Sequence, residues 1–291
     1  MFQRQTKSEV LSGILIILVM VLFSLAIILP FLNIIAVSLS DRNAILAGKV
    51  TFWPIGVNTN AYNAILKDQS ILTGYKNTII VVVTGTVFSV ALTVITGFLL
   101  SRRWLPGNKA FTFLITLTMW FSGGMIPLFL VVRGIGIYNT LWAMFLPTLI
   151  SAYNAIIIRN FIDGIPKALE ESAAIDGVND ITLLSRIFVP LMKAPIATIT
   201  LWIAVGLWNS YMPAILYLNN QELYPLQLIL RDIVFNNTMM NEGGLNDGTL
   251  QTISESIKYA AIIVTALPVM LLYPFIQKYF IKGVMLGAVK G

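Results

Sequence analysis

Six runs of uncharged, mostly apolar residues dominate the pattern of this chain. They cover residues 10–40, 77–101, 110–132, 134–158, 194–221 and 259–277. At about 1.5 Å of rise per residue, roughly 20 helical residues cross a hydrocarbon core about 30 Å thick. The pattern therefore predicts six transmembrane helices, at about 12–38, 77–101, 110–132, 138–159, 195–219 and 259–280.

Composition supports a membrane protein. The chain is 57% hydrophobic and only 11% charged, with a mean hydropathy of +0.83. A soluble domain carries about 25% charged residues, so most of this surface is expected to face lipid. We predict one all-α transmembrane domain over residues 1–291. Its first run is longer than the apolar core of a cleavable signal, which favours a retained signal anchor.

The basic residues indicate an orientation. With the N-terminus in the cytoplasm, the predicted inside segments hold 12 Lys and Arg and the outside loops hold 7. Positive charge concentrates in short cytoplasmic loops, so both termini are expected there. The long loops 41–76 and 222–258 then lie outside, and 159–193 lies inside. A short amphipathic patch within 41–76 is expected at the membrane surface.

Several function classes are excluded by residue types that the chain lacks. There is no Cys and no His, so Ser-His and Cys-His catalysis and histidine or thiolate metal sites are absent. No Asp pair or Ser-Lys dyad lies within the runs, which argues against an intramembrane hydrolase. No Asp, Glu, Lys or Arg lies inside the runs either, which argues against the alternative of an ion-coupled transporter for a small neutral solute.

The inside loop predicts a two-helix bracket, a name we give to residues 165–190. Pro166 suits the first turn of a helix, and Gly177 suits the left-handed position after its end. Asn179 and Asp180 can cap a second helix. Four apolar residues of that helix are expected to form one stripe facing the membrane domain: Ile181, Leu184, Phe188 and Leu191.

A helical wheel of the first bracket helix separates two sides. Ala168, Leu169, Ser172 and Ala173 share one side, while Lys167, Glu170, Glu171 and Ala174 lie opposite. The carboxylates and small residues are therefore expected to face outward, as in a docking knob for another protein. From the pattern alone, an amphipathic hairpin on the membrane surface is about equally compatible.

The bracket resembles the EAA loop of ATP-binding-cassette importer permeases. The family pattern is Glu-Ala-Ala, three residues, Gly, nine residues and Ile-x-Leu-Pro. Here Glu171-Ser-Ala173, Gly177 and Ile187-Phe-Val-Pro190 match it at that spacing, with Ser172 and Val189 as departures. Asn160-Phe161 before Ile165-Pro166, and the C-terminal Gly-Ala-Val-Lys-Gly, are similar to the maltose-type carbohydrate branch. The likeness covers residues 10–291.

The resemblance implies a six-helix type I importer permease fold and a heteromeric complex in a bacterial cell (inner) membrane. The partners would be a second homologous permease, two ATP-binding-cassette ATPases and an extracytoplasmic sugar-binding protein. This chain would be non-catalytic and bind no cofactor, with ATP and Mg on the ATPases; it has no G-x-x-x-x-G-K-[ST] loop. The residues implied in ATPase coupling are Glu170, Glu171, Ser172, Ala173, Ala174, Asp176 and Gly177.

Two further contact regions follow from the same resemblance. The tail would reach between the ATPases, with Ala288, Val289, Lys290 and Gly291. The outer loop would meet the binding protein, and its tip is alternatively a plain connector. The tip residues are Asn236, Asn237, Glu242, Gly243, Gly244 and Asn246.

Possible substrate contacts lie in the third and fifth runs. Aromatic faces and hydroxyl-pairing groups recognise sugars, and an irregular turn at residues 122–124 would let backbone line a cavity. Interface anchoring and helix packing are the more common roles of such residues. The candidates are Gly124, Met125, Trp208, Asn209 and Tyr211. The segment Phe121-Ser-Gly-Gly-Met125 resembles importers of oligosaccharides, so import of an oligosaccharide is the function that the resemblance implies.

Overall fold

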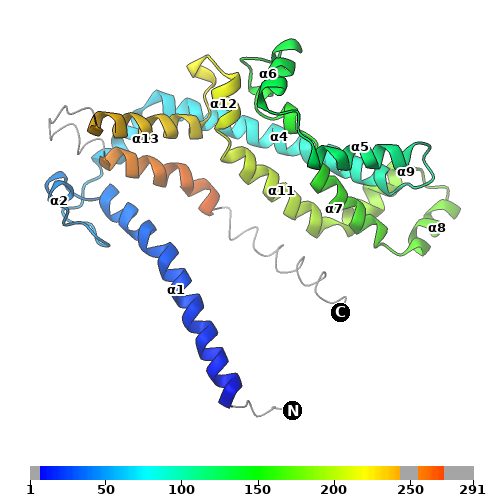
Figure 1. Ribbon diagram of the computed structural model, residues 1–291, viewed down its shortest axis with the longest axis horizontal. Coiled ribbons are helices and arrows are strands. Elements are labelled where there is room, and N and C mark those ends of the chain that lie inside the picture. The colour runs from blue at the N-terminus through cyan, green and yellow to red at the C-terminus, as the bar shows by residue number, and fades with distance from the viewer. Residues whose placement is uncertain (1–6, 243–254, 272–291) are drawn as a thin grey trace. The chain divides into compact units, whose positions relative to one another are not determined.

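The computed structural model describes residues 7–242 and 255–271, with the backbone alone for 7–10 and 236–242. Within these ranges the regular elements are all helical, and no strand occurs (Figure 1). The predicted all-α class is confirmed for this part of the chain. The described residues form two compact units, residues 7–69 with 230–242 and 255–267, and residues 70–229 with 268–271.

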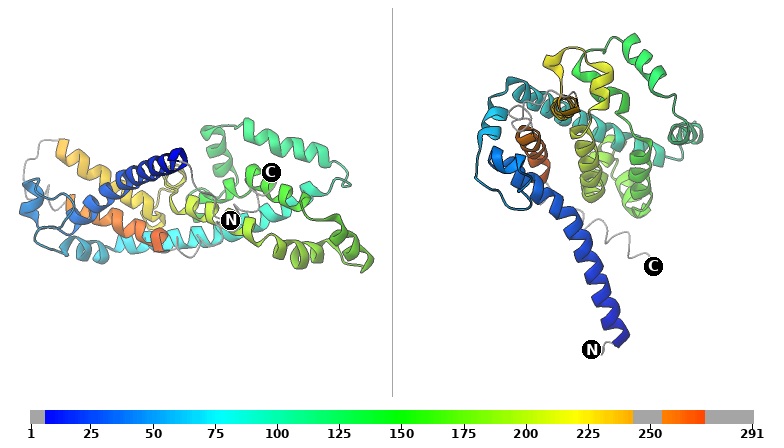
Figure 2. Two further views of the ribbon diagram at one scale, coloured as in Figure 1. Left: turned by 90° about the horizontal axis from the view of Figure 1, so that it is seen from below. Right: turned by 60° about the vertical axis from the view of Figure 1, so that its left-hand side comes forward.

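The first unit contains the long helix α1 (Lys7–Ser38), which forms one continuous helix (Figure 2). None of its most apolar stretch is buried by the rest of the protein, as expected of a helix whose surroundings are lipid or another subunit. Two short helices follow, α2 (Arg42–Leu46) and α3 (Asn60–Lys67). Residues 230–242 and 255–267 also belong to this unit; both stretches are helical, and the second helix continues to residue 271 in the other unit.

Polar contacts hold the segment after α1 in place. The hydroxyls of Ser38 and Tyr62 are 2.8 Å apart, and the N–H of Asp41 donates to the carbonyl of Ile55 at 2.8 Å. The patch predicted at the membrane surface is α3, but Ala61 and Ile65 are buried in protein. That prediction was wrong for this face of α3, because protein rather than lipid covers it.

The second unit is built along α4 (Gln69–Ser101), a 33-residue helix. It begins eight residues before the predicted boundary at 77, because a helix can continue past a charge such as Lys76 once it leaves the hydrocarbon. Three glycines on α4 allow close packing. A Cβ on Gly74 would lie 3.2 Å from Leu226 Cα, one on Gly85 2.7 Å from Leu207 Cδ1, and one on Gly97 2.9 Å from Ala155 O.

The three predicted runs after α4 are not straight helices. The run at 110–132 is α5 (Asn108–Trp120) and α6 (Met125–Gly134), which meet at 120°. The run at 138–159 is the 3-10 turns η1 (Leu141–Met144) and η2 (Leu146–Thr148) followed by α7 (Ala152–Asp163), bent by 51°. The run at 195–219 is α11 (Lys193–Trp208) and α12 (Met212–Tyr217), separated by three residues.

Each break has a local cause. Gly124 has φ +89°, a conformation that favours glycine, and this confirms the irregular turn predicted at 122–124. Pro147 lies in η2, and the Ser151 hydroxyl caps α7 by accepting from the N–H of Asn154. Pro213 lies in the first turn of α12.

The number of membrane spans stays a prediction. Among the described residues, two helices are long and apolar enough to cross a bilayer, Leu11–Ser38 and Gln69–Ser101. Counting each bent pair as one span raises the number to as many as five. The sixth predicted span, 259–280, is described only to residue 271.

The first half of the predicted outer loop 222–258 is largely helical. A 3-10 turn, η4 (Gln221–Leu223), leads into α13 (Leu226–Glu242), a 17-residue helix. The Asn77 side chain donates to the carbonyls of Glu222 (2.7 Å) and Tyr224 (3.1 Å), and the hydroxyl of Thr78 accepts from the N–H of Leu226 (2.8 Å). These contacts of α4 hold the start of α13.

Candidate functional site

The bracket forms a helix, a tight turn and a second helical segment. Its first helix is α8 (Lys167–Ile175), and Pro166 stands one residue before it rather than inside the first turn. Gly177 has φ +70°; its N–H donates to Ala174 O, and the N–H of Val178 donates to Ala173 O. This paired pattern is the Schellman ending, so the predicted left-handed position of Gly177 is confirmed.

The second helical segment is less regular than predicted. It is capped as expected, because the Asn179 side chain accepts from the N–H of Thr182 at 2.8 Å. It then runs as α9 (Asp180–Thr182), a π-helix η3 (Leu183–Phe188) and α10 (Val189–Leu191). A π-helix makes i→i+5 bonds and widens the turn, so residues after it change face relative to an α-helix.

The predicted apolar stripe of this segment was therefore partly wrong. Phe188 is buried and Leu184 is half-buried, but Ile181 is 79% exposed and Leu191 is 57% exposed. Leu183, which the wheel left off the stripe, is buried instead.

A hydrophobic core anchors the bracket to the second unit. Ala173 from α8 and Leu183 and Phe188 from η3 belong to one buried cluster with residues of α4, α7 and α11. Phe98 and Phe188 meet edge to face, with ring centroids 6.0 Å apart. The other members of the cluster are Val94, Ile158, Ile162, Met192 and Ile199.

The two adjacent carboxylates of α8 face different surroundings. Glu170 forms an ion pair with Nη1 of Arg102, the residue after the last turn of α4, and its side chain is 41% exposed. Glu171 is exposed. Neighbouring residues on a helix are about 100° apart, so one can face the protein while the other faces away. The expectation that both face outward was wrong for Glu170.

Arg102 is almost fully buried at this point, with 5% exposure. Its guanidinium carbon lies 4.2 Å from the centroid of the Phe98 ring and 5.4 Å from that of Phe188. A cation over aromatic faces gains about 0.5–2 kcal/mol, most when it is shielded from water. In the sequence, Arg102 is one of the basic residues of the predicted inside segments, and nothing in the pattern around it predicts these contacts.

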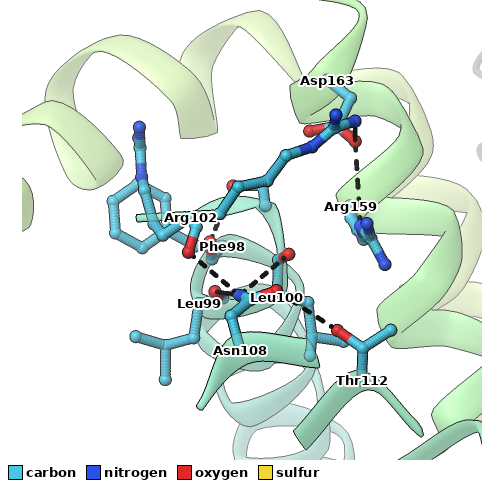
Figure 3. A network of polar contacts seen from close by, with 10 residues as sticks. Phe98, Leu99, Leu100, Arg102, Asn108, Thr112, Arg159 and Asp163 are labelled. Atoms are coloured by element: carbon cyan, nitrogen blue, oxygen red, sulfur yellow. Dashed lines mark hydrogen bonds and ion pairs between the residues drawn. The ribbon is translucent and has the colours of Figure 1, made fainter. Parts of the chain in front are cut away.

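A network of polar contacts surrounds the C-terminal end of α4 beside Arg102 (Figure 3). The Asn108 amide donates to the carbonyls of Leu99 (2.9 Å), Leu100 (3.3 Å) and Arg102 (3.0 Å). Nearby, Asp163 lies 3.7 Å from both Arg159 and Arg103, and the Arg103 side chain is 79% exposed. Asn108 therefore satisfies carbonyls that the helix end would leave without partners.

A cleft of about 580 Å³ opens between the end of α4 and α8. Arg102 and Glu170 line it together with Glu171 and Ala174. Of the other predicted coupling residues, Ser172, Asp176 and Gly177 are exposed, and Ala173 is buried in the core. The bracket thus presents Glu171 and small residues on an outer face, while Ala173 holds it to the protein.

The other predicted contact regions are described only in part. Asn236, Asn237 and Glu242 lie on the backbone of α13, so they are helical rather than part of a loop tip. Gly243, Gly244 and Asn246 lie outside the described residues, as do Ala288, Val289, Lys290 and Gly291.

The proposed substrate residues are not gathered in one cavity. Trp208 is 8% exposed and packs edge to face on Tyr75, while Asn209 and Tyr211 are exposed where α11 ends. Gly124 and Met125 are exposed at the start of α6. None of these five residues lines the cavities of about 290, 460 and 580 Å³ in the described part of the chain.

A different groove has a volume of about 290 Å³, and its lining includes Ser210, between Asn209 and Tyr211 in the sequence. Its lining has hydroxyl, amide and indole groups and no charged side chain. Its residues come from six elements, so no local sequence pattern reveals it. The polar and aromatic ones are Ser89, Thr148, Ser151, Asn154, Trp202 and Ser210. Trp202 also stacks on Tyr153, with centroids 6.4 Å apart.

The described residues contain no group of three or more Asp or Glu side chains that could hold a metal ion.

The chain is similar to known transport proteins over more than nine-tenths of its length. The polygalacturonan/rhamnogalacturonan transport system permease protein YtcP of Bacillus subtilis (strain 168) is 43% identical over 273 residues, 94% of this chain and 96% of that one. Protein LplC of the same organism is 38% identical and covers 91% of this chain and 90% of its own.

The solved structures agree in fold. A crystal structure of a bacterial ABC transporter involved in the import of the acidic polysaccharide alginate contains a chain with a TM-score of 0.87 and 32% identity. The match covers 96% of this chain and 99% of that one, which confirms the type I importer permease fold. Residues 89–285, which include the groove and the bracket, match one protein family. The chain therefore belongs to the binding-protein-dependent transport system inner membrane components.

Proposed function

We propose that this chain is a permease subunit of an ATP-driven importer and that the bracket is its docking element for an ATPase subunit. The observation that carries the proposal is the division of α8 into two faces. Ala173 anchors the helix in the core, while Glu171 and Ser172 remain exposed. A rigid, core-anchored helix with an exposed acid is suited to a groove that supplies a basic group.

In this assembly the chain forms the translocation pathway with a second, homologous permease. Two ATPases bind on the cytoplasmic side, and the excess of Lys and Arg supports this side for the bracket and both termini. ATP-driven closure of the ATPases displaces the bracket, and the packed helices transmit the displacement to the pathway. The tail, residues 288–291, reaches the ATPases, and the region around residues 236–246 meets the external binding protein.

The cargo we propose is an oligosaccharide, and an acidic one. This rests on the relatives, whose names refer to polygalacturonan, rhamnogalacturonan and alginate. The neutral groove on α4, α7 and α11 offers hydroxyl, amide and indole groups for the sugar rings. Family membership favours this function over an ion-coupled transporter.

Charge reversal on α8 tests the proposal. The importer is co-expressed with its ATPase subunits, and the ATPase that elutes with this chain is quantified. Glu171→Lys should reduce the bound ATPase by more than about tenfold, because losing one partner of an interfacial charge pair costs several kcal/mol. Glu222→Lys, at an exposed acid on η4, is the control and should retain the ATPase. If wild-type chain retains no ATPase, or Glu171→Lys retains as much as wild type, the docking assignment is wrong.

A further inference from the structure

Arg102 contacts three elements at the point where the bracket meets the membrane helices. It follows the last residue of α4, pairs with Glu170 of α8, and lies over the rings of Phe98 on α4 and Phe188 on η3. No other basic side chain among the described residues has both an ion pair to α8 and ring contacts of this kind. One cation thus links α4 to both helical segments of the bracket.

The chemistry of this contact makes it sensitive to geometry. The Arg102 side chain is 95% buried, and its Nε and Nη2 atoms have no hydrogen-bond partner among the described residues. A buried cation is tolerated when its charge is compensated, and here compensation comes from one carboxylate and two aromatic faces. Displacing α8 from α4 would leave the guanidinium buried without its counter-charge. The two helices are therefore favoured to move together.

The end of α4 is itself rigid. The three carbonyls bound by Asn108 belong to residues 99, 100 and 102, so the backbone that carries Arg102 is tied to the first turn of α5. Val94 and Phe98 of α4 belong to the same buried cluster as Ala173 of α8. A load applied to α8 therefore reaches α4 through a polar link and a hydrophobic one.

We propose that Arg102 is a positioning residue for energy coupling, which locks α8 to α4 so that the bracket and this helix move as one body. The two adjacent acids then have separate roles: Glu171 faces the ATPase, and Glu170 holds the bracket to its own subunit. This inference rests on the proposed function, because it requires that an ATPase moves the bracket.

Distance measurement between spin labels tests the lock directly. The chain has no Cys, so single cysteines can be introduced at Leu169 on α8 and Val87 on α4, both exposed. The labelled chain is assembled with ATPase partners that lack reactive cysteines, and pulsed EPR distances are recorded without nucleotide and with ATP plus vanadate. In the otherwise wild-type chain we expect one narrow distribution that does not change with nucleotide, because packed elements move as rigid bodies.

Breaking the link should separate the two motions. With Arg102→Gln we expect the ATP-state distribution to broaden about twofold or to split, while the ATPase stays bound through Glu171. Glu170→Gln should do the same, and the double variant should add little, because both substitutions remove one interaction. Arg103→Gln is the matched control; its exposed ion pair with Asp163 is worth about 0–1 kcal/mol by itself and should leave the distribution unchanged.

A functional readout separates positioning from plain stability. We expect Arg102→Gln and Glu170→Gln to hydrolyse ATP in proteoliposomes but to import fewer oligogalacturonides per ATP than the Arg103→Gln control. Arg102→Lys keeps the charge without the planar guanidinium and should fall between. If the Arg102→Gln chain does not assemble with its partners, the Glu170→Gln variant provides the test instead. It removes the ion pair but keeps the contacts of Arg102 with the two aromatic rings.

Two outcomes would overturn the inference. One is a distribution in the assembled Glu170→Gln complex that matches wild type in both nucleotide states. The other is a set of single-variant effects that add in the double variant. Failure of the proposed function looks different, because then the wild-type chain would bind no ATPase and no variant could be compared.

Discussion

Gly97 of α4 lies so close to Ile158 of α7 that a β-carbon on the glycine would be 2.6 Å from Cγ2 of the isoleucine and 2.9 Å from the Ala155 carbonyl oxygen. The isoleucine side chain can rotate away, but the backbone oxygen cannot move without shifting α7. Close approach through small residues is the way helices pack in membranes, where the hydrophobic effect does not drive them together.

Gly97→Val should therefore destabilise the subunit by about 1–3 kcal/mol, the usual cost of overpacking a tight contact. The measurement is the midpoint of thermal unfolding in detergent. Gly13→Val is the control, because a β-carbon on Gly13 of α1 meets nothing within 4 Å. Equal midpoints for the two variants would contradict the close packing of α4 on α7.

The turn at Gly177 offers a second test. Alanine at φ +70° costs about 1–2 kcal/mol, since an L side chain crowds the backbone in the left-handed region. We expect Gly177→Ala to loosen the bracket and to lower retention of the ATPase. Gly164→Ala is matched, because Gly164 ends α7 with φ −84° and its β-carbon would meet nothing closer than 3.4 Å. Unchanged retention in Gly177→Ala would show that docking does not depend on this turn.

These two glycines show what a single sequence can and cannot predict. The caps at Gly177 and Asn179 depend on backbone conformation within a few residues, so residue types alone predicted them. The position of Gly97 against Ile158 depends on a helix 60 residues away, for which the chain carries no local signal. The groove was missed for the same reason, since its lining comes from separate elements.

In the bracket, tertiary contacts override the pattern that the local sequence predicts. The periodicity of residues 181–191 predicted an α-helical stripe, but η3 is a π-helix and buries Leu183 instead of Ile181. A helical wheel puts Glu170 and Glu171 on one side, yet the buried cation of Arg102, which follows α4, pairs only with Glu170. Charge partners far apart in sequence decide such orientations, and periodicity contains no information about them.

Asn108 provides a third prediction. Its amide donates to three carbonyls at the end of α4, so Asn108→Leu should cost roughly 1–3 kcal/mol by leaving buried acceptors unpaired. Asn108→Asp should be at least as harmful, because an ionised carboxylate cannot donate and would face carbonyl oxygens. Thermal unfolding measures both. Thr112→Val is the control; the Thr112 hydroxyl makes only a 3.4 Å contact with Asn108, and its loss should be nearly silent.

The neutral groove gives a prediction about transport rather than stability. Gly206 of α11 lines it, and a β-carbon there meets nothing within 4 Å, so a larger side chain can enter without a clash. If the acidic oligosaccharide proposed above passes here, Gly206→Leu should strongly reduce its uptake while the unfolding midpoint and ATPase binding stay unchanged. Gly13→Leu serves as the control on α1. Normal uptake in Gly206→Leu would exclude the groove as part of the pathway.

Asn139 joins the turn after α6 to the segment after α12, and its replacements should rank in a defined order. Its backbone has φ +58°, its Oδ1 accepts from the N–H groups of Asn219 (2.9 Å) and Asn220 (3.0 Å), and its own N–H donates to Tyr217 O (2.8 Å). Asn139→Asp keeps the acceptor and should remain closest to wild type. Asn139→Gly loses the acceptor but tolerates the conformation, at about 0.5–1.5 kcal/mol for each hydrogen bond lost.

Asn139→Ala should be the least stable of the three, because it loses the same two bonds and adds about 1–2 kcal/mol of left-handed strain. Thermal unfolding of the three variants measures the order, and the difference between the glycine and alanine variants isolates the backbone term from the hydrogen bonds. Equal midpoints for those two would mean that the turn relaxes to a negative φ when the side chain is removed. The amide would then be what imposes the left-handed conformation, and the positive φ would be a consequence of the contacts to Asn219 and Asn220.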